Sequence, residues 1–235
     1  MNATLIAGLA GIIGSLIYAV GDVFLLAGHV GPSQDSRPLR IDTERFPEFK
    51  RRVPLFETLA KLSSRRLAWG GLLGVFAAPL NLAGIWQVAE ALKPAGLWSA
   101  LPPVLLFAYA TVIGSFIHGS FTHIGETLHA IADAPEAGRA TLMQTLARQH
   151  RVVVTAYSVL FICSIIGSFW FASAVISGKT AYPLVMATIN PVTATLAWLL
   201  LKKVLPDFVG RYTEGAGFNI AQMVFFAAST ILASR

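Results

Sequence analysis

Six long apolar stretches, separated by polar segments, set the hydrophobic pattern of this chain. A bilayer core about 30 Å thick is crossed by a helix of about 20 apolar residues, and the six stretches meet that standard. The pattern therefore predicts an all-α membrane protein, a single domain over residues 1–235 built as a bundle of six transmembrane helices with short cytoplasmic interfacial helices. The predicted spans are residues 4–28, 67–92, 97–123, 152–177, 181–201 and 216–233.

Two of these spans contain residues that interrupt a regular apolar helix. The second contains Pro79 and Asn81, and the fifth contains Asn190 followed by Pro191. Such breaks are tolerated in a membrane where neighbouring helices or water satisfy the freed backbone groups. We interpret Asn81 and Asn190 as a secondary polar set with structural roles, in which Asn190 caps locally broken backbone.

The composition supports a membrane protein, and the charge distribution predicts its orientation. The chain is 55% hydrophobic and 13% charged with a mean hydropathy of +0.65, whereas a soluble domain is about a quarter charged. Of its eighteen Lys and Arg residues, nine, three and three lie between spans one and two, three and four, and five and six. The positive-inside rule places those loops in the cytoplasm and both termini outside. We expect a bacterial inner-membrane location, no nucleic-acid partner, and no disulfide within the chain because Cys163 is the single cysteine.

The cytoplasmic loop 29–66 divides into two parts. Its first half is polar and irregular. Its second half places Phe49, Val53, Phe56, Leu59 and Leu62 at helical spacing between basic residues. Residues 46–66 are therefore predicted to lie in the headgroup layer and bind anionic lipid headgroups. The alternative is a solvated loop whose charges only set the topology. Residues 135–150 are predicted to form a second short polar helix that connects two spans.

The stretch FIHGSFTHIGETLHA, residues 116–130, concentrates three of the five histidines and a glutamate at the end of the third span. At 100° per residue, His118 and His129 share one helix stripe with Ser115, Thr122 and Gly125. His123 points to another side of the same helix, so the three histidines cannot all face one metal ion from a straight helix.

Depth in the membrane links this stretch to other spans. Asp22, His118, Tyr157 and Asn219 all lie in the cytoplasmic part of their spans. Ionisable residues within a span are rare and usually face the bundle interior. We predict that these four side chains converge on one polar cavity that opens to the cytoplasm. The alternative is that Asp22 snorkels to the interface and His118 makes a single interhelical hydrogen bond.

Several short motifs occur in an order that resembles a known family. They are IIGSLIYAVGD in span one, LKPAG after span two, a histidine followed by GSF in span three, YP and then NP in span five, and GAGFNIA opening span six. This order is similar to a bacterial family of six-span integral membrane proteins known only as a domain of unknown function. The resemblance implies the six-helix fold and implies no activity.

Three classes of function remain open. The first is a protein that binds or transports a small ligand or protons, for which no cofactor is expected and to which histidine is suited. The second is a hydrolase that acts on lipid, with zinc held by residues of the set His118, His123, Glu126 and His129. That chemistry resembles the alkaline-ceramidase-like membrane hydrolases, but their HxxxH pair is missing here. The third is a scaffold without a small-molecule site, so enzymatic activity and oligomeric state stay open.

Overall fold

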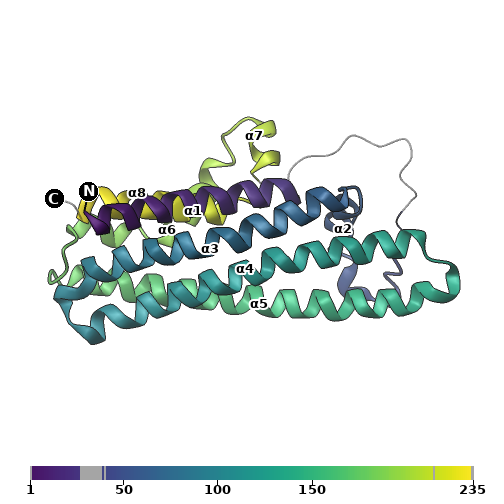
Figure 1. Cartoon of the computed structure of the whole chain (residues 1–235), viewed down its shortest axis with the longest axis horizontal. Coiled ribbons are helices and arrows are strands. Elements are labelled where there is room, and N and C mark those ends of the chain that lie inside the picture. The colour runs from purple at the N-terminus through teal and green to yellow at the C-terminus, as the bar shows by residue number, and fades with distance from the viewer. Residues whose placement is uncertain (1, 27–38, 40, 214, 234–235) are drawn as a thin grey trace.

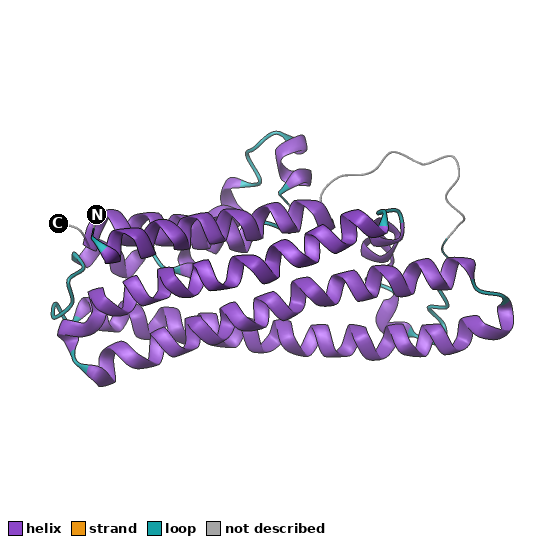
Figure 2. Cartoon of the chain, in the orientation of Figure 1, coloured by secondary structure: helices purple, strands orange, loops and turns teal. Residues whose placement is uncertain are grey.

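Every regular element in the described part of the chain is helical. The computed structural model describes residues 2–26, 39, 41–213 and 215–233, and Figure 2 shows helices joined by loops within them. The all-α prediction is confirmed. The α-helices are α1 (Ala3–Leu26), α2 (Val53–Ala60), α3 (Ser64–Leu92), α4 (Leu97–Asp133), α5 (Glu136–Ile176), α6 (Pro191–Leu201), α7 (Asp207–Tyr212) and α8 (Gly217–Ala233), with short 3₁₀ segments η1 (Pro47–Phe49), η2 (Lys93–Ala95) and η3 (Leu184–Thr188).

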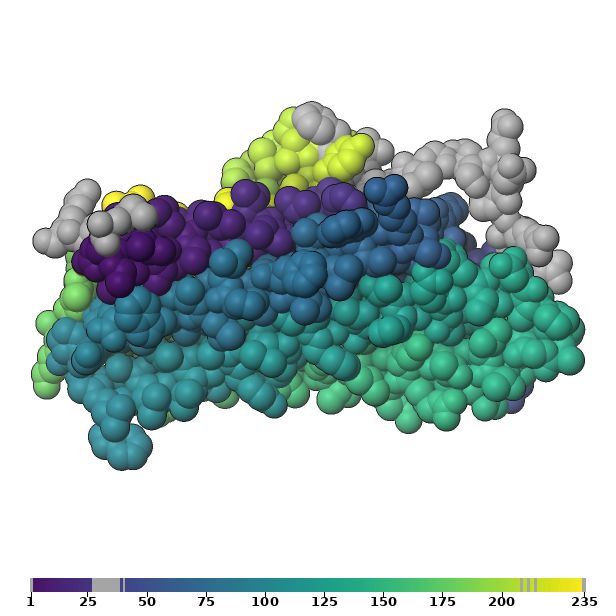
Figure 3. Space-filling model, in the orientation of Figure 1, coloured from purple at the N-terminus to yellow at the C-terminus, as the bar shows by residue number. Residues whose placement is uncertain are grey.

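The long helices form an elongated antiparallel bundle (Figure 1). Contacts run from α1 to α3, α4, α5, α6 and α8 and back to α1, so the helices close a ring. The helices α1, α3 and α4 lie side by side along one face (Figure 3). We call the end where α1 begins and α8 ends the terminal end, and the end where α4 turns into α5 the hairpin end (Figure 1).

Four helices, α1, α3, α4 and α5, are long and apolar enough to cross a membrane. They leave large apolar side chains on the outside of the bundle, including Ile13 at 51%, Phe76 at 58%, Leu105 at 56% and Phe169 at 70% exposure. A soluble monomer rarely exposes so much apolar surface, whereas hydrocarbon solvates it. We therefore treat these helices as membrane-spanning.

The last two predicted spans are shorter than a membrane crossing. Residues 181–201 form η3 and then the eleven-residue α6, and α8 has seventeen residues. The reason is local, since the Asn190 side chain accepts hydrogen bonds from the backbone of Val192 and Thr193 and starts a new helix at Pro191. The predicted cap at Asn190 is confirmed, but this part of the chain does not form a single continuous spanning helix.

The second predicted span is not broken at Pro79. The helix α3 continues through this residue to Leu92. Close approach of α1 to α3 holds the pair together, because a Cβ on Gly11 would lie 2.8 Å from Gly84 Cα. Asn81 is fully buried in this contact, where its side chain accepts a bond from Ser15 Oγ.

The amphipathic part of the loop packs on the protein. The stripe predicted to enter the headgroup layer is buried, with Phe49, Phe56, Leu59 and Leu62 each at most 2% exposed. It covers apolar residues on the α4–α5 hairpin, including Leu128 and Leu146. Of the irregular first half of the loop, residues 29–38 and 40 lie outside the described residues.

The predicted connector helix 135–150 is also different in the structure. It is the first part of α5, which runs without a break from Glu136 into the apolar region. Its apolar stripe is buried under the loop, with Met143 and Leu146 at 2% and 0% exposure. The hairpin and the loop therefore form one small packed unit at the hairpin end.

Candidate functional site

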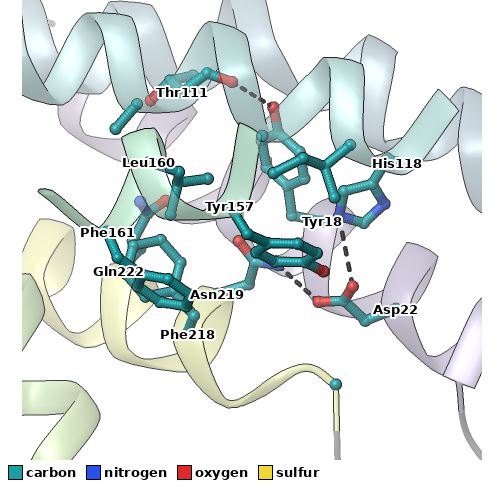
Figure 4. Close-up of a pocket in the computed structure, with 14 residues that line it drawn as sticks. Tyr18, Asp22, Thr111, His118, Tyr157, Leu160, Phe161, Phe218, Asn219 and Gln222 are labelled. Atoms are coloured by element: carbon teal, nitrogen blue, oxygen red, sulfur yellow. Dashed lines mark hydrogen bonds and ion pairs between the residues drawn. The ribbon is translucent and has the colours of Figure 1, made fainter. Parts of the chain in front are cut away.

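A buried carboxylate and a buried imidazole meet inside the bundle, near the end of α1 and past the middle of α4. His118 Nε2 on α4 lies 3.4 Å from Asp22 Oδ1 on α1, and the two side chains are 7% and 10% exposed. Asn219 on α8 donates a 2.6 Å hydrogen bond from Nδ2 to Asp22 Oδ2. Figure 4 shows the carboxylate between these two partners. Both carboxylate oxygens are thus occupied by side chains from other helices.

The hydrogen-bond partner of the second ring nitrogen, Nδ1, indicates which nitrogen of His118 carries a proton. His118 Nδ1 is 3.4 Å from the backbone carbonyl of Gly70 on α3. A carbonyl oxygen only accepts, so this contact is a hydrogen bond when Nδ1 carries a proton. Nε2 then faces Asp22 Oδ1 across 3.4 Å. A proton on either of these two atoms would lie between the imidazole and the carboxyl group, so the geometry suits a pair that exchanges one proton.

Glycines on α3 and α1 make room for the imidazole of His118. A Cβ on Gly74 would overlap the ring of His118, and a Cβ on Gly21 of α1 would lie 3.3 Å from Nδ1. Small residues of this kind let membrane helices approach closely. Here the close approach of α1 and α3 to His118 also forms one wall of a polar site.

The stripe predicted on α4 faces α3. Ser115 Oγ donates to the carbonyl of Gly74 over 3.4 Å, and Thr122 Oγ1 donates to the carbonyl of Leu67 over 2.9 Å. His118 lies between them on the same side of the helix. The helical-angle argument from the sequence therefore placed His118 correctly toward the interior.

A cavity of about 60 Å³ lies beside the pair. It has room for a few water molecules and is too small for a lipid chain. Tyr157 on α5 also lines it, so the structure brings together all four residues predicted to converge: Asp22, His118, Tyr157 and Asn219. Figure 4 shows the ring of Tyr157 beside the carboxylate.

The depth of the site follows from helix geometry. His118 is 21 residues after the first residue of α4, or about 30 Å along the axis at 1.5 Å per residue. That distance matches the thickness of a hydrocarbon core. His118 therefore lies past the middle of α4, with fifteen further residues of the same helix after it, up to Asp133.

Comparison with known proteins gives a family and no activity. The sequence profile of a family of unknown function, DUF6796, matches residues 1–235. The chain belongs to this family. The predicted resemblance to a domain of unknown function is thereby confirmed. No curated protein and no solved structure matches the chain.

Three further polar side chains line this DUF6796 cavity and were not among the four predicted to converge: Tyr18, Thr111 and Gln222. The Tyr18 hydroxyl is 2.7 Å from Ser115 Oγ and donates to the carbonyl of Thr111 over 3.1 Å. Its ring centroid is 5.0 Å from that of His118. The signal was present in the spacing, because Tyr18 is one helical turn before Asp22 and Gln222 is three residues after Asn219.

The histidines predicted as metal ligands are not brought together in the DUF6796 chain. His118 pairs with Asp22, His123 is exposed, and His129 Nδ1 lies 3.7 Å from Glu126 Oε2 near the surface. Among the residues that the structure describes, no group of three or more His, Cys, Asp or Glu side chains could hold a metal ion. The straight α4 helix is the physical reason, since it turns His123 away from the stripe and separates His118 from His129 by eleven residues, or about 16 Å along the axis.

A file of polar side chains continues from the site along α8. Gln222 accepts a 3.1 Å hydrogen bond from Asn81 Nδ2 on α3. Seven residues further along α8, Ser229 Oγ donates a 2.7 Å hydrogen bond to Gln87 Oε1. Between these two contacts, Phe226 packs against Gly11 and Gly84. The file therefore has one polar segment on each side of an apolar barrier.

Proposed function

We propose that this DUF6796 protein binds and transfers protons across the membrane at the Asp22–His118 pair. The observation that supports it best is the pair itself, a buried carboxylate and a buried imidazole 3.4 Å apart beside a cavity of about 60 Å³. Imidazole groups change charge near neutral pH and are common in proton relays. The cavity size favours protons and water over larger cargo.

The polar file on α8 supports a route beyond the pair. Asn219, Gln222 and Ser229 recur at three- and seven-residue spacing, so they lie on one side of the helix. At the terminal end, Gln87 lines a second cavity of about 410 Å³ together with Glu90. Phe226 separates the two polar segments. In the proposal, opening of this barrier connects the site to the terminal side.

The orientation in the proposal follows the charge distribution. We place the hairpin end in the cytoplasm of a bacterial cell and both chain termini on the outer side. The positive-inside rule supports this placement, and α1 begins at the same end of the bundle as α8 finishes (Figure 1). The Asp22–His118 pair then exchanges protons with the cytoplasm.

Proton flux into liposomes tests the proposal. Purified protein is reconstituted with a pH-sensitive dye inside, and a potassium diffusion potential drives proton entry. The wild-type protein is expected to acidify the interior faster than empty liposomes, and Asp22→Asn is expected to return the rate to that of empty liposomes. Asparagine keeps the shape and the contact with Asn219 but cannot exchange a proton.

His123→Ala is the matched control for this flux measurement. His123 is on the same helix as His118 but exposed outside the cavity, so this variant should retain the wild-type rate. Wild-type liposomes no faster than empty ones, or equal flux in Asp22→Asn and wild type, would exclude proton transfer at this pair.

A further inference from the structure

We propose that a cavity on the side of the bundle binds one anionic phospholipid, with the phosphate at Arg52 and His150 and an acyl chain along α5. The cavity measures about 460 Å³ and is lined by residues of the loop, α4 and α5. This volume is within the range of about 300–1,000 Å³ that is usual for small-molecule sites. The inference does not depend on proton transfer.

The basic groups of the cavity are Arg52 and His150, which are close enough to interact electrostatically. Arg52 precedes α2 and His150 precedes the apolar part of α5, and both line the cavity. The His150 Nε2 atom is buried without a hydrogen-bond partner. Within the described part of the chain, no carboxylate forms an ion pair with Arg52. A phosphate oxygen would satisfy both groups.

The rest of the cavity wall is mostly apolar and leads toward the membrane centre. Val154, Tyr157, Ser158 and Phe161 recur along one side of α5 and line the cavity. Phe161 is eleven residues after His150, which is about 16 Å further along the helix axis. An occupant with a charged head and a long apolar chain fits this gradient, whereas a soluble phosphate would leave the apolar wall uncovered.

The surrounding charge selects an anionic head. Exposed basic residues are next in sequence to Arg52 and His150: Lys50, Arg51 and Arg151. The segment 48–52 contains one acidic residue, Glu48, so its net charge is positive. Basic residues at the membrane surface attract anionic lipid. In this proposal the buried apolar stripe of the loop has a positioning role, because its packing on the α4–α5 hairpin holds Arg52 at the cavity.

Native mass spectrometry of delipidated protein tests the site. Three probes are compared: phosphatidylglycerol, phosphatidylcholine with the same chains, and soluble glycerol 3-phosphate. We expect a one-to-one phosphatidylglycerol adduct whose affinity falls at least about tenfold in Arg52→Gln, because a charged hydrogen bond is lost. Arg51→Gln is the matched control and should change the affinity by less than about threefold, since it removes the same charge from an exposed residue that does not line the cavity.

A second variant makes the location testable. Ser158→Trp fills the cavity from an exposed position on α5 and should abolish the phosphatidylglycerol adduct while the protein remains folded. Equal binding of phosphatidylcholine, equal losses in Arg51→Gln and Arg52→Gln, or an adduct that survives Ser158→Trp would overturn the proposal. So would glycerol 3-phosphate binding as tightly as phosphatidylglycerol, which would indicate a free-phosphate site.

Discussion

Replacing His118 with alanine is expected to lower the free energy of unfolding by about 3–5 kcal/mol. The change removes the imidazole from a carboxylate that is 10% exposed, and breaking a buried pair leaves an uncompensated charge. For a chain of this length, such a loss lowers the melting temperature by roughly 6–20 °C. Thermal unfolding in detergent measures it. His123→Ala, an exposed histidine on the same helix, should change stability by less than about 0.5 kcal/mol.

A double-mutant cycle separates the pair from two independent polar residues. Asp22→Asn and His118→Gln each leave one partner without its counterpart, whereas the double variant leaves two neutral amides side by side. The double variant should therefore lose less stability than the sum of the single variants. Strict additivity would mean that Asp22 and His118 do not interact.

Replacing Phe49 with alanine is expected to cost about 3–5 kcal/mol, as for other fully buried aromatic residues. Its side chain is 0% exposed and packs edge to face on Phe56 and His150, with ring centroids 5.1 and 5.6 Å away. The same thermal assay measures the effect. If this segment instead lay in the headgroup layer, the loss of Phe49 would weaken lipid association and hardly change unfolding.

The neighbouring residue Lys50 provides the control for this second prediction. It is exposed on the other side of the same segment, so Lys50→Ala should change stability by no more than about 0.5 kcal/mol. A Phe49→Ala variant as stable as Lys50→Ala would contradict the packing of the loop on the α4–α5 hairpin.

The sequence predicted the interior polar layer because its signals are local and strong. An ionisable residue within an apolar span is rare because burying its charge costs free energy. Asp22 and His118 therefore stand out in the sequence, and the helical angle places His118 on the side of α4 that faces α3. The cap at Asn190 was predictable for the same reason, since an Asn-Pro pair both ends one element and begins the next.

The features that could not be predicted from the sequence depend on contacts between residues far apart in the chain. The stripe at Phe49 and Phe56 has the same pattern whether it covers lipid or the α4–α5 hairpin, and only the packed structure decides between them. The metal set at His123 and Glu126 was suggested by nearness in sequence, although a straight helix turns such neighbours apart. Hydropathy also overestimated the length of the fifth span, because it does not register that the apolar run 181–201 is divided into η3 and α6 at Asn190.

The protonation of Asp22 tests the central claim most directly. Infrared difference spectroscopy of the protein in lipid nanodiscs can follow the carbonyl band of a protonated carboxyl group as the pH changes from about 9 to about 3, a range that brackets the pKa values of ordinary carboxyl and imidazole groups. We predict a band that titrates in the wild type, disappears in Asp22→Asn and shifts its midpoint in His118→Gln. A wild-type spectrum without a titrating band from Asp22, or one unchanged by His118→Gln, would contradict a proton shared by this pair.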